Sequence, residues 1–446
     1  MNFFSDPAPA DIQFRMFYGG PPIAFARMRR SRKRCTPLPA PFRGRKSNKK
    51  ILPGDPAVKD DREMSVRSAF TPLRAAFGLL ILLALYLALW PVPVAPVAWQ
   101  APVDAGYTGD FAANTKLAGL ETTSLLSAGA PAQVAGPEDI AVDARGRVYT
   151  GTHGGLILRF PPPVDGRLRG EPQIWAETDG NPLGLDFDAA GNLIVADAHR
   201  GLLQIDPQAQ VQVLTKVADG QPILFADDLD IARDGRIFFS DASTKFGAKE
   251  LGAEAASLLD ILEHGGHGRL LVYNPADRTT EVLLDGLNFA NGVALAADDS
   301  FVLINETGSY RVLRYWLKGP RATADQEPQI WLDNLPGFPD NIERDRSANL
   351  FWIALASPRS AALDGLSESP FLRKLVQRLP AFLRPKAVSY LHIVAANPAG
   401  EIVHNLQDPN TDFHTNTSVY ADGEMLYLGS LKETALIAVK RERLGL

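Results

Sequence analysis

From about residue 110 to the end of the chain, one arrangement of polar and apolar positions recurs. Each copy has a short polar pair, an apolar run, a turn rich in Asp, Asn or Gly, and a second apolar run. Runs of Val, Ile, Phe, Leu and Tyr on either side of such a turn are typical of β-hairpins. Six copies occur, and they begin at Gly136, Asn181, Phe225, Phe289, Phe338 and Thr415.

The spacing of the copies predicts an all-β fold, a six-bladed β-propeller over residues 110–446. The first three copies begin about 45 residues apart, and repeats of that length with several strands each are the signature of propeller blades. Because a four-stranded blade cannot bury both of its faces alone, neighbouring blades stack around an axis. We expect residues 120–129 to supply a strand that closes the ring with the last blade.

Two insertions interrupt the β pattern, at residues 247–267 and 360–387, and both are predicted to be helical. In the second insertion, apolar and basic positions follow a helical period. The apolar positions are Phe371, Leu372, Leu375 and Leu379, and the basic positions on the opposite side are Arg373, Lys374 and Arg378. This helix either packs over the rim of the propeller or forms a lid or substrate-access element that contacts the membrane.

A transmembrane signal anchor is predicted at residues 75–99, where no charged residue occurs. About 20 apolar residues suffice to span a bilayer as a helix. Arginines precede the span and aspartates follow it, so the N-terminus is expected in the cytoplasm and the propeller on the periplasmic, extracytoplasmic side. A cleaved signal peptide is the alternative, although no clean A-x-A site follows the apolar run.

Residues 1–74 are expected to form a basic, disordered tail. They hold 16 Lys and Arg against 6 Asp and Glu, so the rest of the chain holds 46 − 16 = 30 basic and 51 − 6 = 45 acidic residues. A nucleic-acid-binding arm is an alternative for such a cluster, but no fold motif supports it, and we expect no nucleic-acid partner. A second alternative is that translation begins at Met64.

Composition excludes several classes of protein. A hydrophobic fraction of 46% and a charged fraction of 22% are those of globular material, not of a wholly disordered or collagen-like chain. Cys35 is the single cysteine, which rules out an internal disulfide and a CxxC site. No P-loop, dinucleotide fingerprint or G-x-S-x-G motif occurs.

The polar pairs ahead of the first strand of each copy predict a site. In a propeller, equivalent positions converge on one mouth of the central channel. The pairs are Glu138 and Asp139, Leu183 and Gly184, Asp227 and Asp228, Asn291 and Gly292, Asp340 and Asn341, and Thr417 and Ser418.

Four of these copies place carboxylate or amide oxygens at the axis. Crowded carboxylates repel one another and resist desolvation, which a divalent cation relieves. Oxygen donors without His or Cys favour Ca²⁺, with Mg²⁺ or Mn²⁺ as alternatives. The predicted metal ligands are Glu138, Asp227, Asn291 and Asp340, with Asn341 as a fifth candidate. Two alternatives remain: Asp and Asn here only cap turns, or the metal only holds the blades together.

Three histidines are weaker candidates for contacting a substrate. His153 and His199 follow the second strands of the first two copies, and His414 precedes the last copy. Each also fits a turn or surface position.

Four segments carry a resemblance to a known family. They are FADDLDIARDGRIFFSDASTKF, GRLLVYNP, GLNFANGVALAADDSFVLINETGSYRVLRYWLKG and LPGFPDNI. They resemble strictosidine synthase-like proteins, in particular the membrane-anchored adipocyte plasma membrane-associated branch, over about residues 110–440. The wider relatives, namely the regucalcin/gluconolactonase proteins, paraoxonases and diisopropyl fluorophosphatases, hold a divalent ion in a six-bladed propeller and hydrolyse lactones, aryl esters or organophosphates. The resemblance implies the same metal ligands as the polar pairs.

The chain departs from this pattern at two positions. Strictosidine synthase uses a sixth-blade glutamate where this chain has Thr417, and the second-blade histidine of paraoxonases corresponds to Leu183. We therefore expect a membrane-anchored, metal-dependent hydrolase of small carboxylic (aryl) esters or lactones, with Asp340 as nucleophile or base. The alternatives are a non-catalytic ligand- or partner-binding propeller with a structural Ca²⁺ and, disfavoured by Thr417, strictosidine synthase-like activity.

Overall fold

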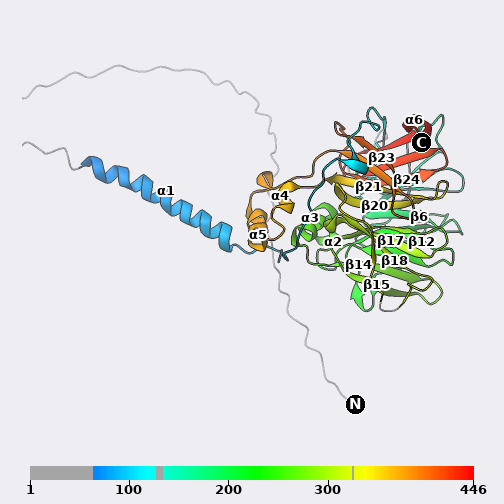
Figure 1. The fold of residues 1–446 in the computed structure, drawn as a ribbon, viewed down its shortest axis with the longest axis horizontal. Helices are drawn as coiled ribbons and strands as arrows, with labels where there is room; N and C mark the ends of the chain where they lie inside the picture. The colour runs from blue at the N-terminus through cyan, green and yellow to red at the C-terminus, as the bar shows by residue number, and fades with distance from the viewer. Residues whose placement is uncertain (1–63, 127–133, 324–325) are drawn as a thin grey trace, which may run out of the picture. The chain divides into compact units, whose positions relative to one another are not determined.

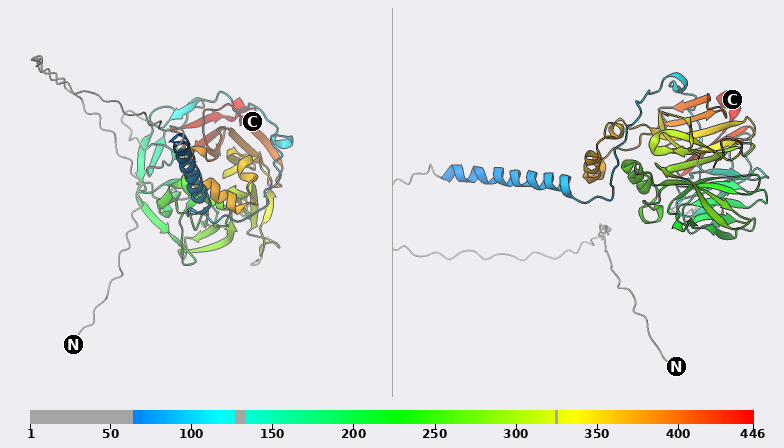
Figure 2. Two further views of the ribbon diagram at one scale, coloured as in Figure 1. Left: turned by 90° about the vertical axis from the view of Figure 1, so that its left-hand side faces the viewer. Right: turned by 60° about the horizontal axis from the view of Figure 1, so that its bottom comes forward.

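The computed structural model describes residues 64–126, 134–323 and 326–446. The chain divides into two units, Met1–Ala69 and Phe70–Leu446, and the second unit contains a β-propeller. In the described residues, six antiparallel sheets of four strands each follow one another around a ring (Figure 1; Figure 2, left). The predicted all-β, six-bladed propeller is confirmed.

The first three blades follow the order of the chain from the inner to the outer strand. Blade 1 consists of β2 (Ile140–Val142), β3 (Val148–Thr150), β4 (Leu156–Phe160) and β5 (Gln173–Glu177). Blade 2 consists of β6 (Pro182–Phe187), β7 (Leu193–Asp197), β8 (Gly201–Ile205) and β9 (Val211–Thr215). Blade 3 consists of β12 (Ala226–Ile231), β13 (Ile237–Asp241), β14 (Gly268–Asn274) and β15 (Thr279–Leu287). A small hairpin of β10 (Val217–Ala218) and β11 (Gln221–Pro222) connects blades 2 and 3.

Blades 4 and 5 repeat this order, and blade 6 does not. Blade 4 consists of β16 (Ala290–Leu295), β17 (Phe301–Glu306), β18 (Arg311–Trp316) and β19 (Gln329–Leu332). Blade 5 consists of β20 (Gly337–Asp345), β21 (Leu350–Pro358), β22 (Leu391–Ala396) and β23 (Ile402–Asp408). Blade 6 takes β24 (Asn416–Asp422), β25 (Met425–Ser430) and β26 (Ala435–Lys440) from the C-terminal end and β1 (Thr122–Ser124) from the start of the domain.

Strand β1 closes the ring. It pairs antiparallel with β26, with Thr122 opposite Ile437 and Ser124 opposite Ala435. The strand predicted within residues 120–129 is therefore present, and it ties the two ends of the propeller together by backbone hydrogen bonds.

The core lies between the blades. Strands such as β13, β17 and β25 are buried along their whole length, because each has a neighbouring sheet on both faces. Between blades 5 and 6, Trp352 packs in one cluster with Leu428 and Ile437. For this reason the apolar runs in the sequence are continuous. A strand with only one buried face would instead alternate apolar and polar residues.

Helix α1 (Met64–Leu89) precedes the propeller. Its segment Pro72–Leu89 is long and apolar enough to cross a membrane, and it is exposed along its length, so it fits a single-pass membrane anchor. The helix ends before Pro91 and Pro93, which lack the N–H that would continue it. The last part of the predicted span, residues 90–99, therefore lies after the end of the helix. Of the predicted basic tail, residues 1–63 lie outside the described residues, and residues 64–74 belong to α1.

Both insertions contain helices, as predicted. The first forms α2 (Ala248–Leu251) and α3 (Ala253–Glu263), and the second forms α4 (Ala361–Asp364), α5 (Pro370–Arg378) and the 3₁₀ turn η3 (Ala381–Leu383). These helices lie together on one face of the propeller (Figures 1 and 2). The described residues also include three short helical segments, η1 (Gly109–Phe111), η2 (Thr307–Ser309) and α6 (Arg441–Leu444).

Candidate functional site

An irregularity in strand pairing places the polar pairs. In blades 2 to 6, the register between the first and second strands shifts at the start of the first strand, for example between Ala226 and Leu229 and between Ala290 and Val293. Such bulges leave residues without an opposite partner and re-aim their side chains. The two residues inside each shift are the predicted polar pair, such as Asp227 and Asp228.

The first members of all six pairs meet at one cavity of about 560 Å³. They are Glu138, Leu183, Asp227, Asn291, Asp340 and Thr417. The sequence-predicted ligands Glu138, Asp227, Asn291 and Asp340 are thus brought together from four different blades. Rotational symmetry explains why residues as far apart in the sequence as Glu138 and Asp340 share one site.

Asn341 lies behind this site. Its Nδ2 donates a hydrogen bond of 3.0 Å to Glu138 Oε1, and it is absent from the described residues that line the cavity. In this arrangement Asn341 orients Glu138.

The carboxylates of the cavity are close enough to affect one another. Burial raises the pKa of Glu138 well above its ordinary value, and the charges of Asp340 and Asp227 raise it further. Burial and the charge of Asp340 likewise raise the pKa of Asp227. Burial raises the pKa of Asp340 to about 7, against the hydrogen bond that Asn291 Nδ2 donates to its Oδ1 at 2.6 Å. The site therefore disfavours three negative charges unless a cation accompanies them.

Three buried oxygens of the predicted ligands have no hydrogen-bond partner among the described residues. They are Glu138 Oε2, Asn291 Oδ1 and Asn341 Oδ1. Leaving a buried polar atom unpaired costs free energy, so these oxygens favour a ligand that accepts their lone pairs. A hard divalent cation has that property.

The candidate donor set combines carboxylates with an amide. In the part of the chain that the structure describes, no three His, Cys, Asp or Glu side chains form a metal-binding group on their own. The candidate centre consists of carboxylates together with the Asn291 amide oxygen. This combination is typical of Ca²⁺ sites.

The backbone beneath these side chains is held by hydroxyl and amide donors. Thr417 Oγ1 donates to the carbonyl oxygen of Glu138 at 2.6 Å, and Thr307 Oγ1 donates to that of Pro339 at 2.6 Å. Gly292 is required by close packing, because a Cβ there would lie 2.4 Å from the backbone nitrogen of Ile342. These contacts fix where neighbouring polar pairs stand relative to one another.

Two of the second members, Asp139 and Asp228, make different contacts from the first members. Asp139 Oδ2 accepts a hydrogen bond from the backbone N–H of Leu185 at 2.9 Å, and Asp228 Oδ2 accepts one from Val293 at 2.8 Å. Both donors lie on the first strand of another blade. The structure therefore separates Asp227, which lines the cavity, from Asp228, which joins strands.

The wall of the cavity is mainly apolar. Phe225, Phe289 and Phe338 stand near the carboxylates, and α3, α4 and α5 add further apolar side chains. A molecule that occupies this cavity would place a polar group at the carboxylates and an apolar body against the helices.

The three histidines predicted as weak substrate contacts are absent from the described residues that line the cavity. His153 approaches Asn181 Oδ1 and the carbonyl oxygen of Leu431. His414 Nδ1 pairs with Glu433 Oε1 at 2.8 Å. The backbone N–H of His199 donates to Asp197 Oδ1 at 3.0 Å.

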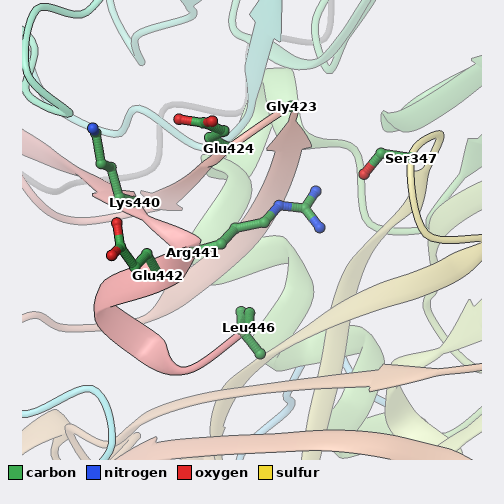
Figure 3. A pocket seen from close by; sticks show the side chains of 7 residues that line it. All are labelled: Ser347, Gly423, Glu424, Lys440, Arg441, Glu442 and Leu446. Atoms are coloured by element: carbon green, nitrogen blue, oxygen red, sulfur yellow. The ribbon is translucent and has the colours of Figure 1, made fainter.

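A second cavity, of about 330 Å³, lies at the opposite ends of the inner strands (Figure 3). It is lined by Ser347, Gly423, Glu424, Lys440, Arg441, Glu442 and Leu446. Arg441 there forms an ion pair of 2.6 Å with Asp345. None of the predicted ligands lines it, so it is separate from the candidate centre.

Comparison with known proteins agrees with this architecture. A family model described as strictosidine synthase matches residues 227–320, and one described as strictosidine synthase-like, N-terminal, matches residues 109–160. Protein strictosidine synthase-like 13 of Arabidopsis thaliana is 35% identical over 305 residues, which cover 62% of this chain and 73% of that protein. The adipocyte plasma membrane-associated protein of Bos taurus is 30% identical over 395 residues, which cover 84% and 90%.

Among solved structures, a gluconolactonase from Xanthomonas campestris superposes with a TM-score of 0.51 at 16% identity, over 79% of this chain and 99% of that one. This likeness concerns the fold. The sequence matches cover more than two thirds of each relative at 30% identity or more. The chain therefore belongs to the strictosidine synthase-like family.

Proposed function

We propose that this protein is a membrane-anchored, metal-dependent hydrolase that cleaves carboxylic esters, aryl esters among them, or lactones in the propeller cavity. The observation that carries the proposal is the group of Glu138, Asp227, Asn291 and Asp340, with two unpaired buried oxygens, beneath an apolar cavity of about 560 Å³. Relatives of this fold include a gluconolactonase, a hydrolase of the proposed kind.

The four side chains would hold one divalent cation, with Ca²⁺ favoured over Mg²⁺ and Mn²⁺ by the oxygen-only donor set. When bound, such an ion polarises a carbonyl oxygen and lowers the pKa of bound water. Asn341 keeps Glu138 in position through its hydrogen bond.

Asp340 is proposed as the reacting side chain. It is partly exposed at the cavity, and the Asn291 amide orients its Oδ1. As a base, it takes a proton from a water molecule that attacks the ester carbon, and it returns this proton to the alkoxide oxygen when the carbon–oxygen bond of the ester breaks, so that a carboxylic acid and an alcohol are released. As a nucleophile, it forms an acyl–aspartate and releases an alkoxide, which takes a proton from water; a second water then cleaves the acyl–aspartate and restores the carboxylate.

A non-catalytic propeller that binds a ligand or partner and has a structural metal is the second candidate. It is favoured by the hydrogen bonds that Glu138 and Asp340 already make to amide groups, because such bonds stabilise a static site. Strictosidine synthase-like condensation is disfavoured, since Thr417 supplies a hydroxyl bonded to backbone where a carboxylate would be needed.

For the membrane topology, we propose that the N-terminus is cytoplasmic and the propeller periplasmic. The basic residues before the apolar segment of α1 and the acidic ones after it support this orientation. A periplasmic reporter fused after residue 110 should be active, and an active cytoplasmic reporter at the same place would reverse the orientation.

The function is tested with the full chain in detergent or vesicles, on aryl esters and lactones of graded apolar length. Turnover should disappear with a chelator and return with Ca²⁺. Turnover that is indifferent to chelation would exclude the metal mechanism. Metal-dependent thermal stability without turnover of any ester or lactone would favour the non-catalytic propeller.

A further inference from the structure

Helix α5 packs against the end of α3 and the segment that follows α1, with its basic side inward. Arg373 is 0% exposed and Arg378 is 7% exposed, whereas Phe371 is 55% exposed. Leu372 is exposed as well. A helix that covers a soluble protein normally shows the reverse arrangement, because its apolar side covers the core.

The inward arginines donate to backbone carbonyl groups of α3, of the end of α1 and the segment after it, and of Ser367, while Arg373 Nε has no partner among the described residues. Arg373 donates to the carbonyl oxygens of Leu262 at 2.8 Å and Ser367 at 3.0 Å, and also to that of Val97. Arg378 Nε donates to the carbonyl oxygen of Trp90 at 2.6 Å. A buried guanidinium without such partners would be strongly unfavourable, so these bonds set which side of α5 faces outward.

Further large apolar side chains are exposed beside α5. Phe382 is 76% exposed, and Leu383, Val388 and, on α3, Leu258 are also exposed. Leu258 and Val388 belong to the wall of the cavity as well. We call the set Leu258, Phe371, Leu372, Phe382, Leu383 and Val388 the apolar rim. Its members lie on α3, on α5 and in the segment after α5, and these helices lie together on one face of the propeller (Figures 1 and 2).

The chain itself holds α3 close to the end of α1. The apolar helix α1 ends at Leu89, and six residues later the backbone N–H of Ala95 donates to Glu263 Oε2 of α3 at 2.7 Å. The N–H of Val97 donates to the carbonyl oxygen of Glu263 at 2.9 Å. Six residues reach at most about 20 Å, so α3 is tied within that distance of the end of α1.

These observations indicate what covers the apolar rim. The interfacial zone of a bilayer accepts exposed Phe and Leu side chains to a depth of about 5–10 Å. Lys386, exposed between Leu383 and Val388, suits the phosphate groups of lipids. We propose that the apolar rim inserts into the surface of the membrane that α1 spans, so that the cavity opens against the bilayer. The proposal rests on α1 being a membrane span, and it is independent of hydrolase activity.

The test places a probe at Phe382 in the full chain. Cys35→Ser removes the single cysteine, and Phe382→Cys or Phe371→Cys then accepts an environment-sensitive fluorophore. The protein is reconstituted in vesicles of phosphatidylcholine and phosphatidylglycerol, with and without lipids that bear a nitroxide quencher on the acyl chain. Val164→Cys is the matched control, because Val164 is 52% exposed and lies between β4 and β5, at the other end of the blade from the cavity.

Lipid quencher should lower the emission at positions 371 and 382 severalfold more than at position 164. Equal, weak quenching at all three positions in a chain that resists alkaline extraction would overturn the proposal while leaving the anchor intact. Extraction of the chain by alkali would overturn both.

Discussion

Two neighbouring layers of the channel contain the same kind of side chain in different surroundings. At the mouth, Glu138, Asp227 and Asp340 face a cavity, and the buried Glu138 Oε2 has no partner among the described residues. One residue further along, Asp139 and Asp228 each accept a backbone N–H from another blade. Burial raises the pKa of Asp228, but the N–H of Val293 opposes that rise. A buried carboxylate is therefore a candidate ligand in the first layer and a strand connector in the second.

The largest effect should come from the mouth layer. We expect Asp340→Ala to lower ester or lactone turnover by about 10²–10⁴-fold, the usual range for losing a general base, with little change in fold. Steady-state kinetics beside circular dichroism would measure this. Asp298→Ala, the same change at an exposed turn, is the control and should retain full turnover. Equal activity in the two variants would remove Asp340 from the reaction.

Substitutions of Asp139 or Asp228, which accept backbone N–H groups from another blade, should lower the stability of the fold. Asp228→Ala leaves the buried N–H of Val293 without its acceptor, so we expect the free energy of unfolding to fall by about 1–3 kcal/mol. Chemical denaturation of the detergent-solubilised chain would measure the loss. A variant as stable as the parent would show that Asp228 does not join the blades.

At the mouth of the channel, removing the charge of a carboxylate should raise the free energy of unfolding when no metal is bound. In chelator, Asp227→Asn relieves the repulsion from Asp340, so we expect an increase in unfolding free energy of about 1 kcal/mol, the value of one pKa unit. With Ca²⁺ added, the parent should be stabilised more than the variant. Thermal melts in both conditions test this, and a lower melting temperature of the variant in chelator would contradict charge crowding.

The smallest effect concerns the support of the site. Thr417→Val removes the hydroxyl that donates to the carbonyl oxygen of Glu138 and keeps the shape of the side chain. We expect a loss of about 0.5–1.5 kcal/mol in stability and less than a tenfold change in turnover. Thr417→Ser keeps the donor and should restore both values. Loss of all turnover in Thr417→Val would instead place Thr417 in contact with the substrate.

The repeat in the sequence determined the number of blades, the strand that closes the ring and the column of residues that meets at the channel mouth. These features follow from local pattern, because each hairpin repeats the same order of apolar runs and turns, and rotation brings equivalent positions together. The helices in the two insertions could be predicted from the sequence for the same reason, because a helical pattern is also local. The roles of the gathered side chains as ligands or as a reacting group stay predictions.

Only the tertiary structure decided what each member of a polar pair touches. Asp227 and Asp228 are alike in sequence, and the register shift at the start of β12 sends one to the cavity and the other to the next blade. It also decided the orientation of α5. An amphipathic pattern indicates that the two sides of a helix differ, but it does not indicate which side faces inward. Carbonyl groups at the end of α3 and after α1 accept hydrogen bonds from Arg373 and Arg378, and these bonds place the two arginines on the inner side. Those acceptors come from segments more than 100 residues away, so their effect appears only when the chain is folded.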